Sequence, residues 1–139
     1  MTDLDYITSA AGRFYKEAGF AFPDNAREYF ESVMENPLVF TKTIIGKGFV
    51  VGFIAPSFLE PTKMICTELA WYVEPMYRGT TVALRLMKMY EKEASDKRCD
   101  QVSMVCLEAL DPEKTGDIYT RLGYTKIENH YKKDLVWQY

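Results

Sequence analysis

Residues 73–83 read VEPMYRGTTVA, and this stretch decides the fold because a predicted strand ends in it and a predicted helix begins in it. The strand is Met64–Val73, and the helix follows Thr81, where apolar residues recur at helical spacing. The first backbone N–H groups of such a helix have no partners within it, and its dipole is positive there. The turn therefore predicts a site for an anion such as a pyrophosphate. The alternative is a plain loop with a solvated Arg78.

The residues before this stretch predict two helices and a hairpin. Their order is a helix over 4–18 stopped by Gly19, a helix from 23–24 to 36–37 capped by Asp24 or Asn25, and strands 38–45 and 49–54 around a glycine turn.

The residues after it predict a central strand, a helix and two last strands. The near-continuous apolar run 101–107 is typical of a buried central strand. Asp111 and Pro112 then open a helix as cap and first residue, and Gly123 ends it. Segments 124–128 and 131–137 are predicted strands around a turn. The chain is thus expected to be one α/β sandwich, α+β in character, with a mixed, mostly antiparallel sheet around a central strand–helix–strand unit.

Composition restricts the classes of function. The 139 residues fit one domain, and 47% of them are hydrophobic. A net charge of −3 argues against a general nucleic-acid binder, and no apolar run is long enough to span a membrane. The N-terminus lacks the pattern of a signal peptide, so a cytoplasmic location is expected.

Cysteine and histidine usage excludes further chemistry. The three Cys show no CxxC spacing, so no metal site or disulfide framework is expected. Because His130 is the only histidine, acid–base chemistry must use carboxylates, Tyr, Cys or Lys. Cys106 would need that histidine as its base and is interpreted as a core residue. Both tryptophans are expected to serve packing.

Two other side chains are candidates for catalysis. Glu68 stands inside an apolar strand, where an acid is costly unless it is paired or functional, and it could act as a general base. A solvent-facing Glu68 is the alternative. Tyr119 lies one turn before Gly123 and could donate a proton to a departing sulfur. With ten Tyr in the chain, a core or surface role is the favoured interpretation for any one of them.

Nearly the whole chain resembles the GNAT superfamily of N-acetyltransferases. Its signature, Q/R-x-x-G-x-G/A, begins the helix that cradles the pyrophosphate of coenzyme A. Arg78 and Ala83 match it, and Thr81 replaces the central Gly. The sequence ahead of the signature, V-x-P-x-Y-R-G, also matches. Residues 118–124, IYTRLGY, resemble the family motif whose Tyr is a general acid. The segment 68–75 looks most like members encoded by tailed phages.

The resemblance implies a single acetyltransferase domain over 1–139, whose first strand is missing. It implies direct transfer from acetyl-CoA to a primary amine of a small molecule or protein, with Glu68 as base and Tyr119 as acid. The implied residues for acetyl-CoA are Tyr72, Val73, Arg78, Gly79, Thr80, Thr81, Val82 and Ala83. Because Thr81 adds a side chain where Gly allows close approach, a non-catalytic CoA-binding or structural module is the alternative.

The resemblance also places the acceptor amine between the first two helices and the final hairpin. The first forty residues hold seven acidic and three basic side chains, which could favour a cationic amine. Solvated helix faces explain the same excess. A homodimer through the last strands is left open.

Overall fold

The computed structural model describes residues 1–107 and 110–136 of the chain. The elements, in order, are α1 (Asp3–Ala18), α2 (Ala26–Glu35), β1 (Val39–Ile44), β2 (Gly48–Pro56), β3 (Met64–Val73), the 3-10 turn η1 (Pro75–Tyr77), α3 (Val82–Asp96), β4 (Gln101–Ser103) and α4 (Pro112–Arg121). The sheet order is β1-β2-β3-β4. The first two pairings are antiparallel and β3–β4 is parallel. The expected mixed, mostly antiparallel sheet is therefore confirmed.

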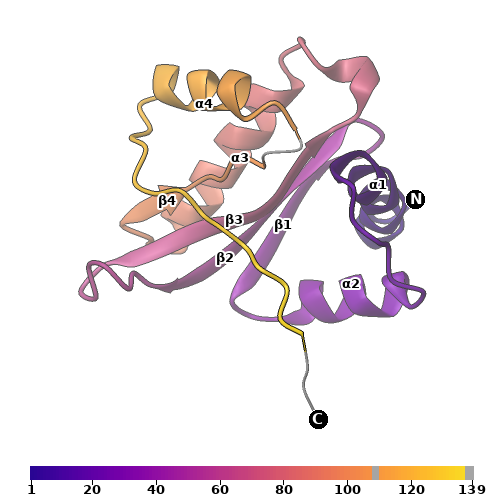
Figure 1. Cartoon of the computed structure of the whole chain (residues 1–139), viewed down its shortest axis with the longest axis horizontal. Helices are drawn as coiled ribbons and strands as arrows, with labels where there is room; N and C mark the ends of the chain where they lie inside the picture. The colour runs from indigo at the N-terminus through magenta and orange to yellow at the C-terminus, as the bar shows by residue number, and fades with distance from the viewer. Residues whose placement is uncertain (108–109, 137–139) are drawn as a thin grey trace.

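The sheet lies between α1 and α2 on one side and α3 on the other (Figure 1). Phe14 of α1 packs edge-on against Phe49 and Tyr72 on one face of the sheet. Leu86 and Tyr90 of α3 pack against the other face and are fully buried. Alternation along β2 and β3 thus supplies both apolar cores, as a strand covered on two faces requires.

Local signals set the helix ends. Thr2 and Asp5 form a reciprocal capping box at the start of α1, and Gly19 ends that helix in the left-handed conformation. Asp111 caps α4, as expected, by accepting a hydrogen bond from the Lys114 N–H. Asn25 precedes α2 but its side chain makes no capping bond, so that expectation is wrong.

A bulge changes the register in the middle of the sheet. Gly52 lies opposite Glu68, whereas Val51 lies opposite Ala70, so Leu69 is the extra residue of β3. Bulges of this kind kink a strand and are frequent beside active sites. On its other edge β3 pairs with β4 only from Ile65 to Thr67. Beyond that point the two chain segments part.

Two sequence predictions about strands are wrong. The strand expected over 101–107 ends at Ser103, and no strand forms over the described residues 124–136. Because β4 pairs over only three residues, it offers no long edge for a final hairpin, and an isolated hairpin is marginal in water. Large apolar side chains in this tail, such as Tyr131 and Val136, remain exposed. Trp137 lies outside the described residues. No helix in the described part of the chain is long and apolar enough to cross a bilayer.

The close approach of strands at Gly52 gives a stability prediction. A Cβ at this position would lie 2.7 Å from Cys66 Sγ and 2.8 Å from the Phe40 ring. Gly52→Ala should therefore lower the free energy of unfolding in urea by about 1–3 kcal/mol. Gly116→Ala is the matched control in α4, where nothing lies within 4 Å of a Cβ. It should raise that free energy by roughly 0.5–1 kcal/mol. Equal effects of the two substitutions would contradict the packing described.

Candidate active site

The parting of β3 and β4 creates the candidate site. Their last paired residues are Thr67 and Ser103. Glu68 is the next residue on β3, and its carboxylate accepts a hydrogen bond from the Val105 N–H across the gap. The carboxyl group thus stands at the point where the sheet opens.

Glu68 is only 5% exposed. Burial raises its pKa to about 8, and the hydrogen bond from Val105 offsets only part of this effect. Loss of hydration disfavours the charged carboxylate, and no described Lys or Arg pairs with it. The group is therefore mostly protonated at neutral pH and poised to exchange a proton near pH 8.

Tyr119 reaches the same backbone unit from α4. Its hydroxyl donates to the Val105 carbonyl at 2.7 Å. Burial, together with the nearby Glu68 carboxylate, raises the pKa of this phenol, so it holds its proton. The structure therefore brings together the two predicted catalytic residues, which bond to the N–H and the C=O of one residue.

An aromatic group surrounds Tyr119. The rings of Trp71 and Tyr124 each have centroids 5.7 Å from that of Tyr119. Trp71 Nε1 and the Tyr124 hydroxyl are buried and have no hydrogen-bond partner among the described residues. Buried polar atoms normally have hydrogen-bond partners, so two such atoms without partners beside the gap indicate a place suited to a polar ligand. Sequence reasoning missed both residues: it assigned Trp71 to packing and had no signal for Tyr124 beyond its place after Gly123.

The free edge of β3 can accept an extended ligand. The Glu74 N–H bonds to the carbonyl of Lys47, the residue just before β2, so strand alternation turns the backbone of Tyr72 toward β2 as well. The backbone N–H and C=O of Trp71 and Val73 face the opposite edge, which β4 does not cover. Of the two strand residues predicted to bind acetyl-CoA, Val73 thus has the better-placed backbone.

At the start of α3, where the anion site is predicted, one backbone N–H group already has a partner within the protein. Gly79 has φ +81° and open space around its Cα, as a close backbone approach requires. Thr81 precedes the helix without a side-chain capping bond. Thr80 Oγ1, however, accepts a long, 3.3 Å hydrogen bond from the Val82 N–H. The N–H groups of the first turn otherwise depend on partners outside the helix.

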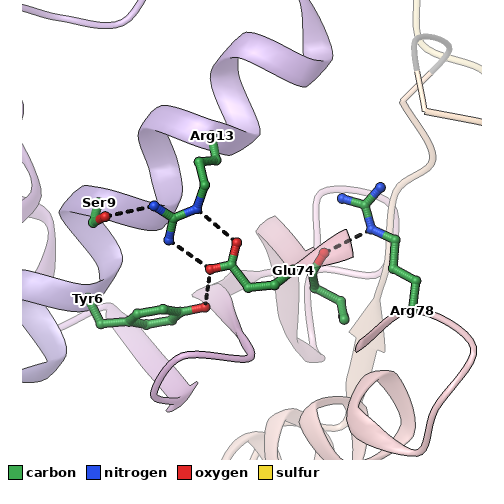
Figure 2. Close-up of polar contacts among 6 residues, drawn as sticks. Tyr6, Ser9, Arg13, Glu74 and Arg78 are labelled. Atoms are coloured by element: carbon green, nitrogen blue, oxygen red, sulfur yellow. Dashed lines mark hydrogen bonds and ion pairs between the residues drawn. The ribbon is translucent and has the colours of Figure 1, made fainter. Parts of the chain in front are cut away.

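Arg78, predicted to bind the pyrophosphate, is held by the protein itself. Its guanidinium forms two bonds with the Glu17 carboxylate, at 2.7 and 2.8 Å, and Nε donates to the Val73 carbonyl at 2.9 Å (Figure 2 shows the latter). Its charged group lies 5.5 Å from the Tyr72 ring centroid. In this arrangement Arg78 fixes the loop to α1 and to the end of β3.

A second cluster attaches the same loop to α1. Arg13 donates to both Glu74 oxygens, at 2.8 and 2.7 Å, and Tyr6 donates to one of them at 3.0 Å (Figure 2). Burial alone would raise the pKa of Glu74, but the bonds from Arg13 and Tyr6 outweigh it and hold that pKa below its usual value. This cluster could not be predicted from sequence patterns, because Arg13 and Tyr6 lie 61 and 68 residues from Glu74.

Within the described part of the chain, no group of His, Cys, Asp or Glu side chains is arranged to hold a metal ion. The polar groups at the gap are a carboxyl group, a phenol and free backbone amides. Such a set suits proton transfer next to a bound extended substrate.

A mixed sheet that parts beside a buried acid and a phenol is the architecture of an acyltransferase. The model of the acetyltransferase (GNAT) family matches residues 5–124, and the chain belongs to this family. The resemblance noted from the sequence is thereby confirmed, and the protein is an acyltransferase. None of the comparisons bears on the narrower resemblance to phage-encoded members.

Solved structures agree in fold. An acetyltransferase of Trypanosoma brucei is 19% identical, with a TM-score of 0.72 and 96% of each chain covered. A predicted acetyltransferase of Clostridium acetobutylicum, solved with acetyl-CoA, is 16% identical, with a TM-score of 0.69 over 95% of this chain and 90% of that one. AAC(6')-Iy, in complex with a CoA bisubstrate analogue, is 15% identical, with a TM-score of 0.74 over 95% and 92%. No curated protein matches the sequence.

The raised pKa of Glu68 predicts a pH-dependent stability. In the unfolded chain a Glu has a pKa of about 4.3, so between pH 5 and 8 the folded state holds one more proton. Raising the pH through this range therefore favours unfolding, and Glu68 should lower the free energy of unfolding by about 1.4 kcal/mol per pH unit. The loss should be complete above about pH 8.

Urea unfolding of wild type and Glu68→Gln from pH 5 to 9 measures this effect. The variant should lack the fall in stability, so the difference between the two proteins should widen with pH. Glu31→Gln is the matched control, because Glu31 is exposed on α2 and its carboxylate stays in water in both states. Parallel curves for wild type and Glu68→Gln would contradict the assigned burial.

Proposed function

We propose that this acyltransferase moves an acetyl group from acetyl-CoA directly onto a primary amine, with both substrates bound at once. The observation that carries the proposal is the meeting of Glu68 and Tyr119 at Val105, where β3 and β4 part. A carboxyl group and a phenol lie there at one opening in the sheet, and their chemistry supports the roles of base and acid. The neighbour solved with acetyl-CoA and the one bound to a CoA bisubstrate analogue support this reading at the level of the fold.

The loop before α3 is the proposed site for the diphosphate of acetyl-CoA. Gly79 leaves room for close approach, and the first N–H groups of α3 supply donors at the positive end of its dipole. Thr80, Thr81, Val82 and Ala83 surround this turn. Bound phosphate would replace the bond from Val82 N–H to Thr80 Oγ1, which is long at 3.3 Å.

The pantetheine arm is proposed to run along the free edge of β3. The outward N–H groups of Trp71 and Val73 and the C=O of Trp71 would pair with its amides, as an added strand would, while the Val73 C=O already accepts from Arg78 Nε. The Val73 N–H could also polarise the thioester carbonyl. Trp71 Nε1 and the Tyr124 hydroxyl, both orphaned in the protein, are further donors beside the gap.

The proton transfers follow from the two side chains. A primary amine with a pKa of about 10 arrives protonated, and the ionised fraction of Glu68, which grows as the pH approaches 8, accepts that proton. The nitrogen lone pair then forms the C–N bond to the acetyl carbon as the C–S bond breaks. Tyr119 donates its proton to the departing sulfur. As the amide forms, its nitrogen loses the second proton, which restores the Tyr119 phenol, and the Glu68 proton passes to solvent.

Tyr119→Phe tests the acid role. The variant should lose about 100-fold or more of its kcat for CoA thiol release, because the leaving sulfur has no proton donor. Acetyl-CoA affinity should stay within about twofold. Acetyl-CoA at about 100 times its Kd should still stabilise the variant by roughly 2.7 kcal/mol in thermal unfolding. Tyr131→Phe, on the exposed tail, is the matched control. Unchanged turnover would remove Tyr119 from this role, and no ligand-induced stabilisation of the wild type would sink the proposed function.

The base role gives a distinct pH profile. In the wild type kcat/KM should rise through about pH 8, as Glu68 loses its proton, and fall above ~10, as the amine loses its own. In Glu68→Gln only the neutral amine reacts, so a lower kcat/KM should keep rising to pH ~10. Glu31→Gln should retain the wild-type profile. Identical profiles for wild type and Glu68→Gln would show that another group is the base.

A further inference from the structure

Tyr90 of α3 bonds to both strands at the point where β3 and β4 part. Its hydroxyl donates to the Cys66 carbonyl of β3 and to the Ser103 carbonyl of β4, each at 2.9 Å. The pairing of these strands ends at Thr67 and Ser103, so the two carbonyl groups belong to its last residues. One side chain from a helix therefore joins the two strands at the end of their pairing.

A single proton serves both of these carbonyl groups. A phenol has one O–H donor, and a carbonyl oxygen can only accept, so the two oxygens share the hydrogen in a three-centre bond. Burial raises the pKa of the Tyr90 phenol well above its usual value, so the proton stays in place across the neutral pH range. The link between the strands is therefore independent of pH in this range.

Packing fixes the position of the Tyr90 ring. The residue is fully buried, and its ring centroid lies 5.7 Å from that of Phe40 on β1. Leu86, one turn earlier on α3, is fully buried in the same core. Close packing of this kind leaves an aromatic ring no room to move aside. The hydroxyl is therefore a fixed point that sets the positions of both strands.

The candidate catalytic groups lie two residues beyond this shared bond on each strand. Glu68 follows Cys66 by two residues, and Val105 follows Ser103 by two. The bond from the Val105 N–H to the Glu68 carboxylate is thus the next link between the two segments. A shift of Ser103 relative to Cys66 would move Val105 as well, and would disturb its bonds to Glu68 and to Tyr119.

We propose that Tyr90 is a positioning residue for the acyl transfer, because its hydroxyl fixes the separation of β3 and β4 and so holds Val105 where it bonds to Glu68 and Tyr119. Tyr90 is fully buried and acts through the backbone at Ser103. Its part in catalysis rests on the proposed function, whereas the placement of Val105 can be tested without any reaction.

A carbon NMR titration of the Glu68 carboxyl group tests this placement in Tyr90→Phe, which keeps the ring and removes the shared donor. The Val105 N–H lowers the pKa of Glu68, which is about 8. A displaced Val105 would no longer stabilise the carboxylate, so this pKa should rise above the wild-type value. Tyr119 also lies near Glu68, but burial raises its pKa, so it stays neutral during the titration. An unchanged or lower pKa of Glu68 would overturn the inference.

Ala94→Gly is the matched control for a general loss of stability. Ala94 is buried on the same helix, one turn beyond Tyr90. A Gly there weakens the helix and removes a buried methyl group. Both variants should melt at a lower temperature than the wild type, but only Tyr90→Phe should raise the pKa of Glu68. An equal rise in the control would assign the effect of Tyr90 to stability alone and overturn the inference.

Steady-state kinetics test the link to the reaction. Tyr90→Phe should lower kcat for CoA thiol release about 10-fold or more, because small misplacements of acid–base groups have effects of this size. KM for acetyl-CoA should stay within about twofold, and the acidic limb of kcat/KM should move upward from about pH 8. Ala94→Gly should keep the wild-type kcat below its melting temperature.

The two measurements separate the two proposals. A raised pKa of Glu68 together with a wild-type kcat in Tyr90→Phe would overturn the positioning role while leaving the transferase proposal intact. If the wild type releases no thiol with any amine, the proposed function fails. The NMR titration then decides by itself whether Tyr90 places Val105.

Discussion

The early end of pairing between β3 and β4 is the constraint on which the rest of the structure depends. Parallel pairing stops at Thr67 and Ser103, and the bulge at Leu69 kinks β3 at the same level. Backbone groups on the facing edges are left without the partners that a continuous sheet would give. At Val105 these partners are side chains of other residues: the N–H donates to the Glu68 carboxylate, and the C=O accepts from the Tyr119 hydroxyl. Acid–base groups thus occupy the gap because the backbone there needs partners.

A sheet opened in this way needs another means of holding the loop before α3. Helix α1 holds this loop through two ion pairs, Arg13 with Glu74 and Glu17 with Arg78. These pairs are half-exposed, so each contributes modestly to stability, and their main effect is on position. They fix the loop from the side of α1. The anion site can therefore be rigid although one flank of β3 is unpaired.

Features that depend on neighbours in sequence could be predicted, and features that depend on distant contacts could not. Gly19, Asp111 and Gly123 act within one turn of their helices, so the helix ends that they set could be predicted from the sequence. Glu68 and Tyr119 could be singled out by residue type, but their meeting at Val105 depends on the parting of two strands. The strand predicted over 101–107 keeps its pairing only as far as Ser103, and beyond it Val105 is exposed although the run is apolar. The final hairpin failed because a strand needs an edge, which sequence does not show.

The raised pKa of Glu68 follows from the exclusion of water at the gap between β3 and β4. A carboxylate in such a place gains most from a single positive partner, because charge pairs strengthen as the local dielectric falls. An ammonium group that enters the gap would supply that partner and displace remaining water. The same loss of hydration that holds a proton on the empty site would therefore favour proton transfer once an amine is bound.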